Sequence, residues 1–393
     1  MKESKIKTLF KSDGFQSLLS SIISIVIGIL IGFVAMVIIT CINEKNTFID
    51  AVKGLRIICS GPMSSSITKY VLTNTGNMIF YSVPLIFTGL SVAIAYKTGL
   101  FNIGAPGQYI MGIIGSLLVA LYLPKTGMTG FGVWLLAILA GTLLGALWGM
   151  IPGLLKAFFN INEVIICIMT NWIAANIASL VFTYTTGIQS TENTKGGFLA
   201  KPLDAYTPKL GLDKIFEGSL IDAGILIAIV MAIIVYVILN KTTFGYELKA
   251  CGANKNAAKY AGLNEKRNIV ISIAIAGGLA GMGAALYYLN PGIEYKFVSQ
   301  YSGLPAYGFN GIASAFLANC NPIGIIFSSV LIRYLNIGGD YLVSVGFNRY
   351  VADIVVAVII YMAGFSRIIK ETLGKNRRTK VDSNSNAETK EAK

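Results

Sequence analysis

Long apolar stretches recur along the whole chain and restrict its fold more than any other feature. A transmembrane helix needs about 20 predominantly apolar residues, and about ten stretches approach that length. Each should be helical, because backbone groups facing lipid must form their hydrogen bonds within their own segment. The stretches lie near residues 17–40, 77–96, 107–123, 131–151, 164–184, 219–239, 268–289, 303–318, 322–336 and 350–369. The sequence therefore predicts an all-α, polytopic integral membrane protein with a transmembrane domain over residues 17–369.

The distribution of charge predicts the orientation of the chain. Charged residues make up only 13% of the sequence, yet the net charge is +13. The basic residues gather in the N-terminal segment 1–16, in the loop 240–267 and in the tail 370–393. Basic loops of membrane proteins lie in the cytoplasm, so this pattern needs no nucleic-acid partner. We expect both termini to be cytoplasmic at the cell membrane, the tail to be disordered, and the loops 41–76 and 185–218 to be extracellular.

The extracellular loop 41–76 contains apolar residues at helical spacing. Phe48, Val52, Leu55 and Cys59 recur at intervals of three or four residues, and basic residues lie between them. This pattern is typical of a short amphipathic helix on a membrane surface.

Two regions interrupt the apolar pattern with glycine, proline and asparagine. They are the segment 98–108, between the second and third expected spans, and the start of the eighth span near residues 303–311. Broken helices at membrane depth are tolerated only where protein or a water-filled cavity covers them. The pairs Phe101-Asn102 and Phe309-Asn310 each lie beside glycines, which raises the possibility of two inverted five-helix repeats.

Several kinds of chemistry lack the residues that they need. The chain has no histidine, and its five cysteines form no C-x-x-C pair, so we predict no metal, no cofactor and no catalytic site. The sequence contains no G-x-x-x-x-G-K-[ST] phosphate loop, so any ATP must be hydrolysed by another chain. The expected spans hold few ionisable groups, and they form no proton relay. An ion-coupled secondary transporter remains an alternative, because backbone carbonyls alone can hold sodium.

The cytoplasmic loop 240–267 predicts a short helix over residues 254–261. Asn254 can cap its N-terminus, Ala257 and Ala258 favour helix, and Gly262 suits a left-handed C-terminal residue. The loop is either a basic topology signal or a helix that docks on a cytoplasmic partner. In the second case the contact would involve Gly252, Asn254, Ala257, Ala258, Tyr260 and Gly262.

Three further motifs make the chain resemble a known family. They are FNIGAPGQ (101–108), NEVIICIMTNWIA (162–174) and GFNGIASAFLANCNPIG (308–324). With the basic loop, they are similar to motifs of the branched-chain amino acid/ribose/nucleoside type of ABC transporter permeases, over roughly residues 75–370. The first motif resembles the FNIGAEGQ form of the nucleoside/simple-sugar branch. Pro106 and Asn310 stand where that family has acidic residues, which leaves the solute open.

The resemblance implies a transport subunit that moves a small polar solute, most simply a nucleoside or related sugar, by alternating access. Ribose-type sugars and branched-chain amino acids are the alternatives within the family. The implied partners are a cytoplasmic ABC ATPase, a second permease of the same family and an extracellular solute-binding lipoprotein.

The amide side chains of the motifs suit a neutral polar solute, because they donate and accept hydrogen bonds without a buried charge. Alternatively, these amides bridge helices or satisfy broken backbone, and Asn171 and Trp172 serve packing. The predicted substrate path comprises Phe101, Asn102, Gly104, Gln108, Phe309, Asn310 and Gly311.

Overall fold

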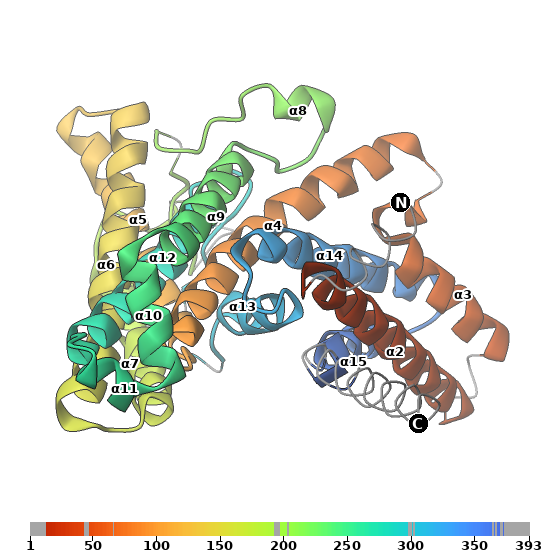
Figure 1. Ribbon diagram of the computed structural model, residues 1–393. Coiled ribbons are helices and arrows are strands. Elements are labelled where there is room, and N and C mark those ends of the chain that lie inside the picture. The colour runs from red at the N-terminus through yellow and green to blue at the C-terminus, as the bar shows by residue number, and fades with distance from the viewer. Residues whose placement is uncertain are drawn as a thin grey trace, which may run out of the picture. The chain divides into compact units, whose positions relative to one another are not determined.

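The computed structural model describes residues 13–42, 47–65, 67–191, 197–202, 204–297, 301, 303–363, 365, 368–369 and 372. The expectations for residues 1–12 and for nearly all of the tail 370–393 lie outside these ranges. The described chain is mainly helical (Figure 1). Its α-helices are α2 (Asp13–Ile42), α3 (Phe48–Ser60), α4 (Thr68–Lys97), α5 (Ala105–Tyr122), α6 (Phe131–Phe159), α7 (Glu163–Tyr184), α8 (Leu212–Ile215), α9 (Gly224–Lys241), α10 (Thr243–Ala253), α11 (Lys255–Tyr260), α12 (Glu265–Tyr288), α13 (Ala306–Leu317), α14 (Pro322–Asp340) and α15 (Arg349–Ala363). Three short 3-10 helices are η1 (Gly61–Ser64), η2 (Leu123–Thr126) and η3 (Tyr341–Val345).

Eight candidate spans in the described ranges are long and apolar enough to cross a membrane. They are Leu19–Ile42, Thr68–Lys97, Ala105–Thr126, Phe131–Phe159, Glu163–Tyr184, Gly224–Lys241, Glu265–Tyr288 and Pro322–Val345. A polytopic helical membrane protein is therefore confirmed, whereas the expected number of ten spans is not. The two remaining expected spans correspond to α13, with 12 residues, and to α15, described over 15 residues. At about 1.5 Å per residue, α13 is shorter than a bilayer core of about 30 Å.

The chain divides into two compact units, and the first comprises residues 1–61, 316–319 and 338–393. Inside it, α2 packs on α15 through a pair of glycines one helical turn apart. A methyl group on Gly28 would lie 2.8 Å from the carbonyl oxygen of Ile359, and one on Gly32 would lie 3.1 Å from Val355 Cγ1. Small residues four apart let two membrane helices approach closely.

The same unit contains α3, which confirms the helix expected within the loop 41–76. Its N-terminus is closed by a capping box in which Asp50 bonds back to Thr47. The helix buries Ala51, Gly54 and Ile58, whereas Phe48 and Val52 of the predicted apolar face are exposed. A capping box and a small-residue face thus define α3, and its place on the outer membrane surface stays a prediction.

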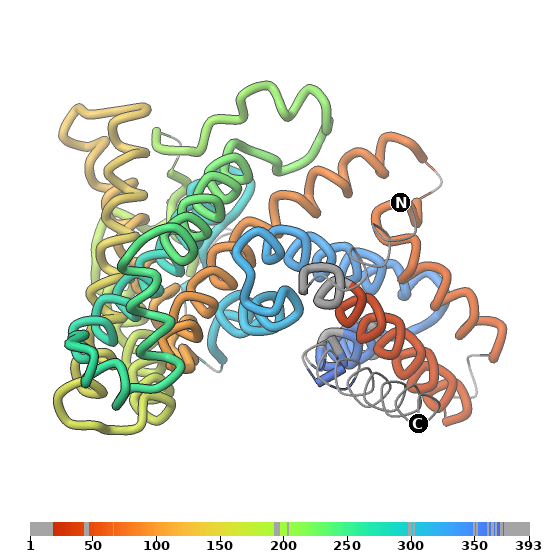
Figure 2. The backbone as a smooth tube through the Cα atoms, in the orientation of Figure 1, coloured from red at the N-terminus to blue at the C-terminus, as the bar shows by residue number. Residues whose placement is uncertain are grey.

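The second unit comprises residues 62–315 and 320–337, and α4 is its central helix. Every residue of α4 from Ser82 to Ala95 is buried. A helix that is enclosed on all sides has no preferred apolar face, which is why the sequence shows no periodicity there. Figure 2 shows the course of the chain through this unit.

Helices α6 and α12 of the second unit pack backbone to backbone through glycines. A methyl group on Gly145 would clash with the carbonyl oxygen of Gly277, and one on Gly149 would lie 2.6 Å from the carbonyl oxygen of Ile273. A methyl group on Gly281 would clash with the carbonyl oxygen of Gly141. The contact therefore depends on small residues along both helices.

We expect Gly145→Ala to lower the thermal stability of the purified protein, because the added methyl group meets backbone that cannot move aside. Gly132→Ala in the same helix is the matched control, since a methyl group there meets only Met128 Cε at 3.8 Å. Size-exclusion chromatography after heating in detergent measures both variants. Equal melting of the two variants would contradict the glycine contact.

Candidate functional site

The chain leaves helical structure between α4 and α5, and this break organises the candidate site. Gly99, just past the end of α4, has a φ of +76°, a conformation that glycine adopts without strain. Helix α5 begins at Ala105, and its first backbone N–H groups have no partner within the helix. Pro106 carries no N–H, so one of these unpaired donors is absent.

Asn171 of α7 satisfies the backbone on both sides of the break. Its Oδ1 accepts from the backbone N–H of Gly107 at 2.8 Å, and its Nδ2 donates to the carbonyl oxygen of Ile103 at 3.0 Å. Asn171 is only 1% exposed. It therefore caps the start of α5 from another helix, and it joins the motifs 101–108 and 162–174.

Asn102 lies in the break, and Gln108 lies in the first turn of α5. Their two amide groups bond to each other in both directions. The Nδ2 of Asn102 donates to Gln108 Oε1 at 2.9 Å and to Ser91 Oγ at 3.1 Å. The Oδ1 of Asn102 accepts from Gln108 Nε2 at 3.2 Å and from the backbone N–H of Gly104 at 3.1 Å. Both side chains are 1% exposed.

The third motif lies against the same place through two glycines of α13. A methyl group on Gly308 would lie 2.6 Å from the backbone nitrogen of Pro106, and one on Gly311 would clash with the side chain of Thr88. Thr88 Oγ1 also donates to the carbonyl oxygen of Tyr307 at 3.0 Å. The motifs 101–108, 162–174 and 308–324 are far apart in the sequence, and they meet at the start of α5.

The structure places the predicted path residues in two groups. Asn102, Gly104 and Gln108 are buried and contact one another, and Phe101 beside them is half-buried. On α13, Gly311 is buried, Asn310 is half-buried and Phe309 is 41% exposed. In this conformation the amides of the first group satisfy one another and the nearby backbone. Their contact with a transported solute stays a prediction.

Residues 74–364 match the family described as branched-chain amino acid transport system / permease component. The chain belongs to this family. It is therefore a multi-pass permease component of a transport system in the cell membrane, and it is not an enzyme. No solved structure is significantly similar to it.

Characterised relatives cover most of the chain. It is 33% identical over 304 residues to the guanosine ABC transporter permease NupP of Bacillus subtilis, a match covering 77% of this chain and 84% of NupP. It is 35% identical over 305 residues to the nucleoside ABC transporter permease NupB of Lactococcus lactis, covering 76% of this chain and 81% of NupB. The glucose ABC transporter permease TsgB13 of Haloferax volcanii is 27% identical over 295 residues, covering 74% of this chain and 75% of TsgB13.

The loop 240–267 contains the short helix that the sequence predicts. Asn254 Oδ1 accepts from the backbone N–H of Ala257 at 3.1 Å, and Gly262 has a φ of +81° after the helix ends. The backbone N–H of Leu263 bonds to the carbonyl oxygen of Ala258 at 3.0 Å, which completes a glycine-based C-terminal cap. Helix α10 precedes α11, and the sequence analysis did not predict it. Its N-terminal cap is Thr242, whose Oγ1 accepts from the backbone N–H of Gly245, and a threonine at that position was a signal in the sequence.

The side chains of this loop differ sharply in exposure. Ala258 is 4% exposed and is therefore buried within this chain, whereas Tyr260 is 94% exposed.

The loop also contacts the end of α4 through Gly252, where a methyl group would clash with the carbonyl oxygen of Lys97. A methyl group on Gly99 would lie 3.1 Å from Gly252 Cα. The loop therefore contacts the chain two residues before the motif 101–108.

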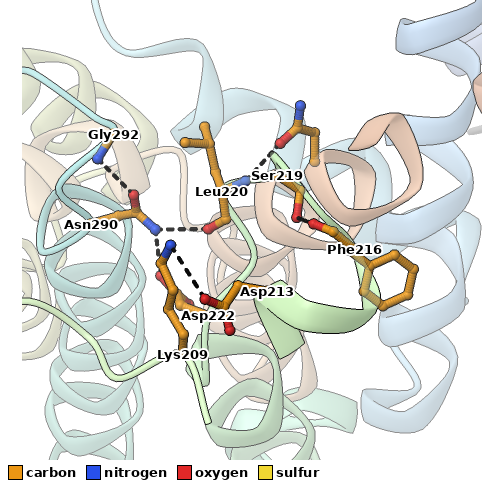
Figure 3. Close-up of polar contacts among 9 residues, drawn as sticks. Lys209, Asp213, Phe216, Ser219, Leu220, Asp222, Asn290 and Gly292 are labelled. Atoms are coloured by element: carbon orange, nitrogen blue, oxygen red, sulfur yellow. Dashed lines mark hydrogen bonds and ion pairs between the residues drawn. The ribbon is translucent and has the colours of Figure 1, made fainter. Parts of the chain in front are cut away.

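A second polar cluster, which the sequence did not predict, follows the C-terminus of α12 (Figure 3). Asn290 Nδ2 donates to Asp222 Oδ2 and to the carbonyl oxygen of Leu220, both at 2.8 Å, and Gly292 N–H donates to Asn290 Oδ1 at 2.9 Å. Asp222 precedes α9 and is 2% exposed. Burial raises the pKa of Asp222 to about 6, and the hydrogen bonds from Asn290 and Gly224 oppose that rise. This cluster fixes the chain where α12 ends.

We expect Asn171→Leu to destabilise the protein and to impair transport. It leaves the N–H of Gly107 and the carbonyl of Ile103 buried without partners, at a cost of about 1–3 kcal/mol each. Asn176→Leu is the matched control, because Asn176 is exposed on the same helix and its Nδ2 donates to the carbonyl oxygen of Trp172 in its own helix. Thermal melting in detergent and uptake by the reconstituted complex are the measurements. If both variants behave as wild type, Asn171 does not support the break.

Proposed function

We propose that this chain is the membrane-spanning permease of an ATP-driven importer for nucleosides. The observation that carries the proposal is its identity of 33–35% to guanosine and nucleoside permeases over about three-quarters of the chain. The glucose permease is less similar, at 27%. The absence of a phosphate loop from the sequence supports a separate ATPase subunit.

The contact between Gly252 and Gly99 supports a mechanical role for the loop 240–267. ATP-driven transport requires that closure of the ATPase changes the balance between two states of the membrane domain. A partner docked on α11 would push on the loop, and the loop lies against the turn that precedes the motif 101–108. In this proposal the loop and both termini are cytoplasmic, and the loop 185–218 is extracellular.

The relatives also support a second permease as partner. Bacillus subtilis has two guanosine permeases among them, NupP and NupQ, which are 33% and 26% identical to this chain. Lactococcus lactis has two nucleoside permeases, NupB and NupC, at 35% and 31%. We infer that this chain takes the place of NupP or NupB in a pair of unlike permeases. An extracellular solute-binding lipoprotein would deliver the nucleoside.

We expect nucleoside uptake by the reconstituted complex to require ATP on the ATPase side. It should continue after ionophores collapse the proton and sodium gradients, because the sequence offers no carboxylate relay. Radiolabelled guanosine and ribose, each with and without ATP, are the probes in proteoliposomes. Uptake by this chain alone, driven by an ion gradient, would instead support the secondary-transporter alternative.

We expect Tyr260→Ala to weaken binding of the ATPase. A tyrosine at the centre of an interface typically contributes about 2 kcal/mol or more, so the affinity should fall by about thirtyfold or more. Tyr206→Ala is the control, because Tyr206 is 47% exposed in the loop that we assign to the opposite membrane side. Co-purification of the ATPase with each variant is the measurement. Unchanged co-purification with Tyr260→Ala would remove α11 from the interface.

A further inference from the structure

Aromatic rings from four helices of the second unit contact one another in a group that we call the tyrosine cluster. Tyr287 of α12 stacks on Phe80 of α4, with ring centroids 5.5 Å apart, and it meets Tyr307 of α13 at 5.0 Å. Tyr307 in turn stacks on Tyr109 of α5, with centroids 6.2 Å apart. Tyr81, which lies 6.1 Å from Tyr287, completes the cluster on α4.

The cluster continues into the segment that follows α12. Tyr288 meets Tyr295 edge to face at 5.2 Å, and Tyr295 contacts Phe182 of α7 at 5.0 Å. The hydroxyl groups of Tyr295 and Tyr301 contact each other. Asn290 lies between Tyr288 and Tyr295 in the chain, so its bonds to Asp222 and Leu220 hold this part of the cluster in place (Figure 3).

Two polar groups at the cluster are buried without a hydrogen-bond partner among the described residues. The hydroxyl group of Tyr109 is one, and the side chain of Tyr109 is 0% exposed. The other is Nε of Arg333, on α14. An unsatisfied buried polar group is costly, and a charged residue within a membrane span usually serves function.

Arg333 contacts an aromatic ring of the tyrosine cluster directly. Its guanidinium carbon lies 4.9 Å from the centroid of the Tyr81 ring, a cation–π contact. Tyr81, Tyr287, Tyr307 and Arg333 are each half-buried, so part of each side chain remains accessible. The cluster therefore combines half-buried tyrosines with two buried hydrogen-bond donors that have no partner among the described residues.

We propose that the tyrosine cluster and Arg333 bind the base of a nucleoside during transport, an assignment that rests on the proposed function. A heterocyclic base has two ring faces that stack on tyrosine, and its ring nitrogens and carbonyl oxygens accept hydrogen bonds. The hydroxyl group of Tyr109 and Nε of Arg333 are donors with no partner in the described part of the chain. A simple sugar has no aromatic ring and no ring nitrogen, so it would lack the π-stacking and part of the hydrogen bonding that a base offers, and the site favours nucleosides over sugars.

The location of the cluster fits the entry of solute in the orientation proposed above. Helix α12 begins at Glu265, at the end of the loop 240–267, and ends at Tyr288. Its 24 residues span about 36 Å, which is enough to cross the bilayer core. The cluster therefore lies toward the extracellular end, where a binding protein would release its nucleoside.

Tyr109→Phe tests the site, because it removes one hydroxyl group and leaves the ring. Since no described residue bonds to this hydroxyl, its removal should not lower the melting temperature of the solute-free protein. The half-saturating guanosine concentration for uptake should rise about 2–10-fold, the loss of one hydrogen bond. Arg333→Gln should act in the same direction. Tyr122→Phe is the matched control on α5, because that hydroxyl bonds to the backbone of Thr186 outside the cluster.

The outcomes separate the site from the transport function. The proposal predicts weaker guanosine uptake for Tyr109→Phe and Arg333→Gln than for wild type and Tyr122→Phe, with unchanged ATPase binding. If the wild-type complex imports guanosine and both variants match it, the site is overturned and the transport function stands. If the wild-type complex imports no nucleoside, both proposals fail. If Tyr109→Phe melts below wild type, its hydroxyl has a structural partner and the site is likewise overturned.

Discussion

The break between α4 and α5 places backbone polar groups inside a membrane domain, where neither lipid nor a regular helix can satisfy them. Protein side chains must therefore form hydrogen bonds with these backbone groups. Asn171 bonds to both sides of the break, and Asn102 and Gln108 pair beneath it. Pro106 removes one donor that would otherwise need a partner. This requirement explains why α7 lies against the start of α5 and why three separate motifs meet there.

Glycine contacts connect this break to the rest of the second unit. Gly99 lies against Gly252 of the loop 240–267, and Gly308 of α13 lies against Pro106. Because backbone contacts backbone at these points, little side-chain rearrangement can absorb a displacement. In the function proposed above, a push on the loop would reach the motif 101–108 and then α13 through these contacts. Such close-packed contacts suit a domain that changes between two discrete arrangements.

The second unit contains two buried polar regions, which differ in whether their polar groups have hydrogen-bond partners. At the break, the neutral amides of Asn102 and Gln108 satisfy one another. At the tyrosine cluster, by contrast, the hydroxyl group of Tyr109 and Nε of Arg333 have no partner among the described residues. We infer that the first region supports the fold, and that the second has the unused bonding capacity that a solute requires.

The sequence by itself determined the helical membrane fold, since apolar length and charge bias act locally along the chain. It also determined the cap at Asn254 and the turn at Gly262, which depend on neighbours within a few residues. It did not determine the number of spans, because α13 is shorter than its apolar pattern indicates. Only the tertiary structure decided that Asn171 caps α5 and that the tyrosines form one cluster. Those contacts join residues far apart in the chain, and a single sequence carries no local signal for the partner of a buried amide or aromatic ring.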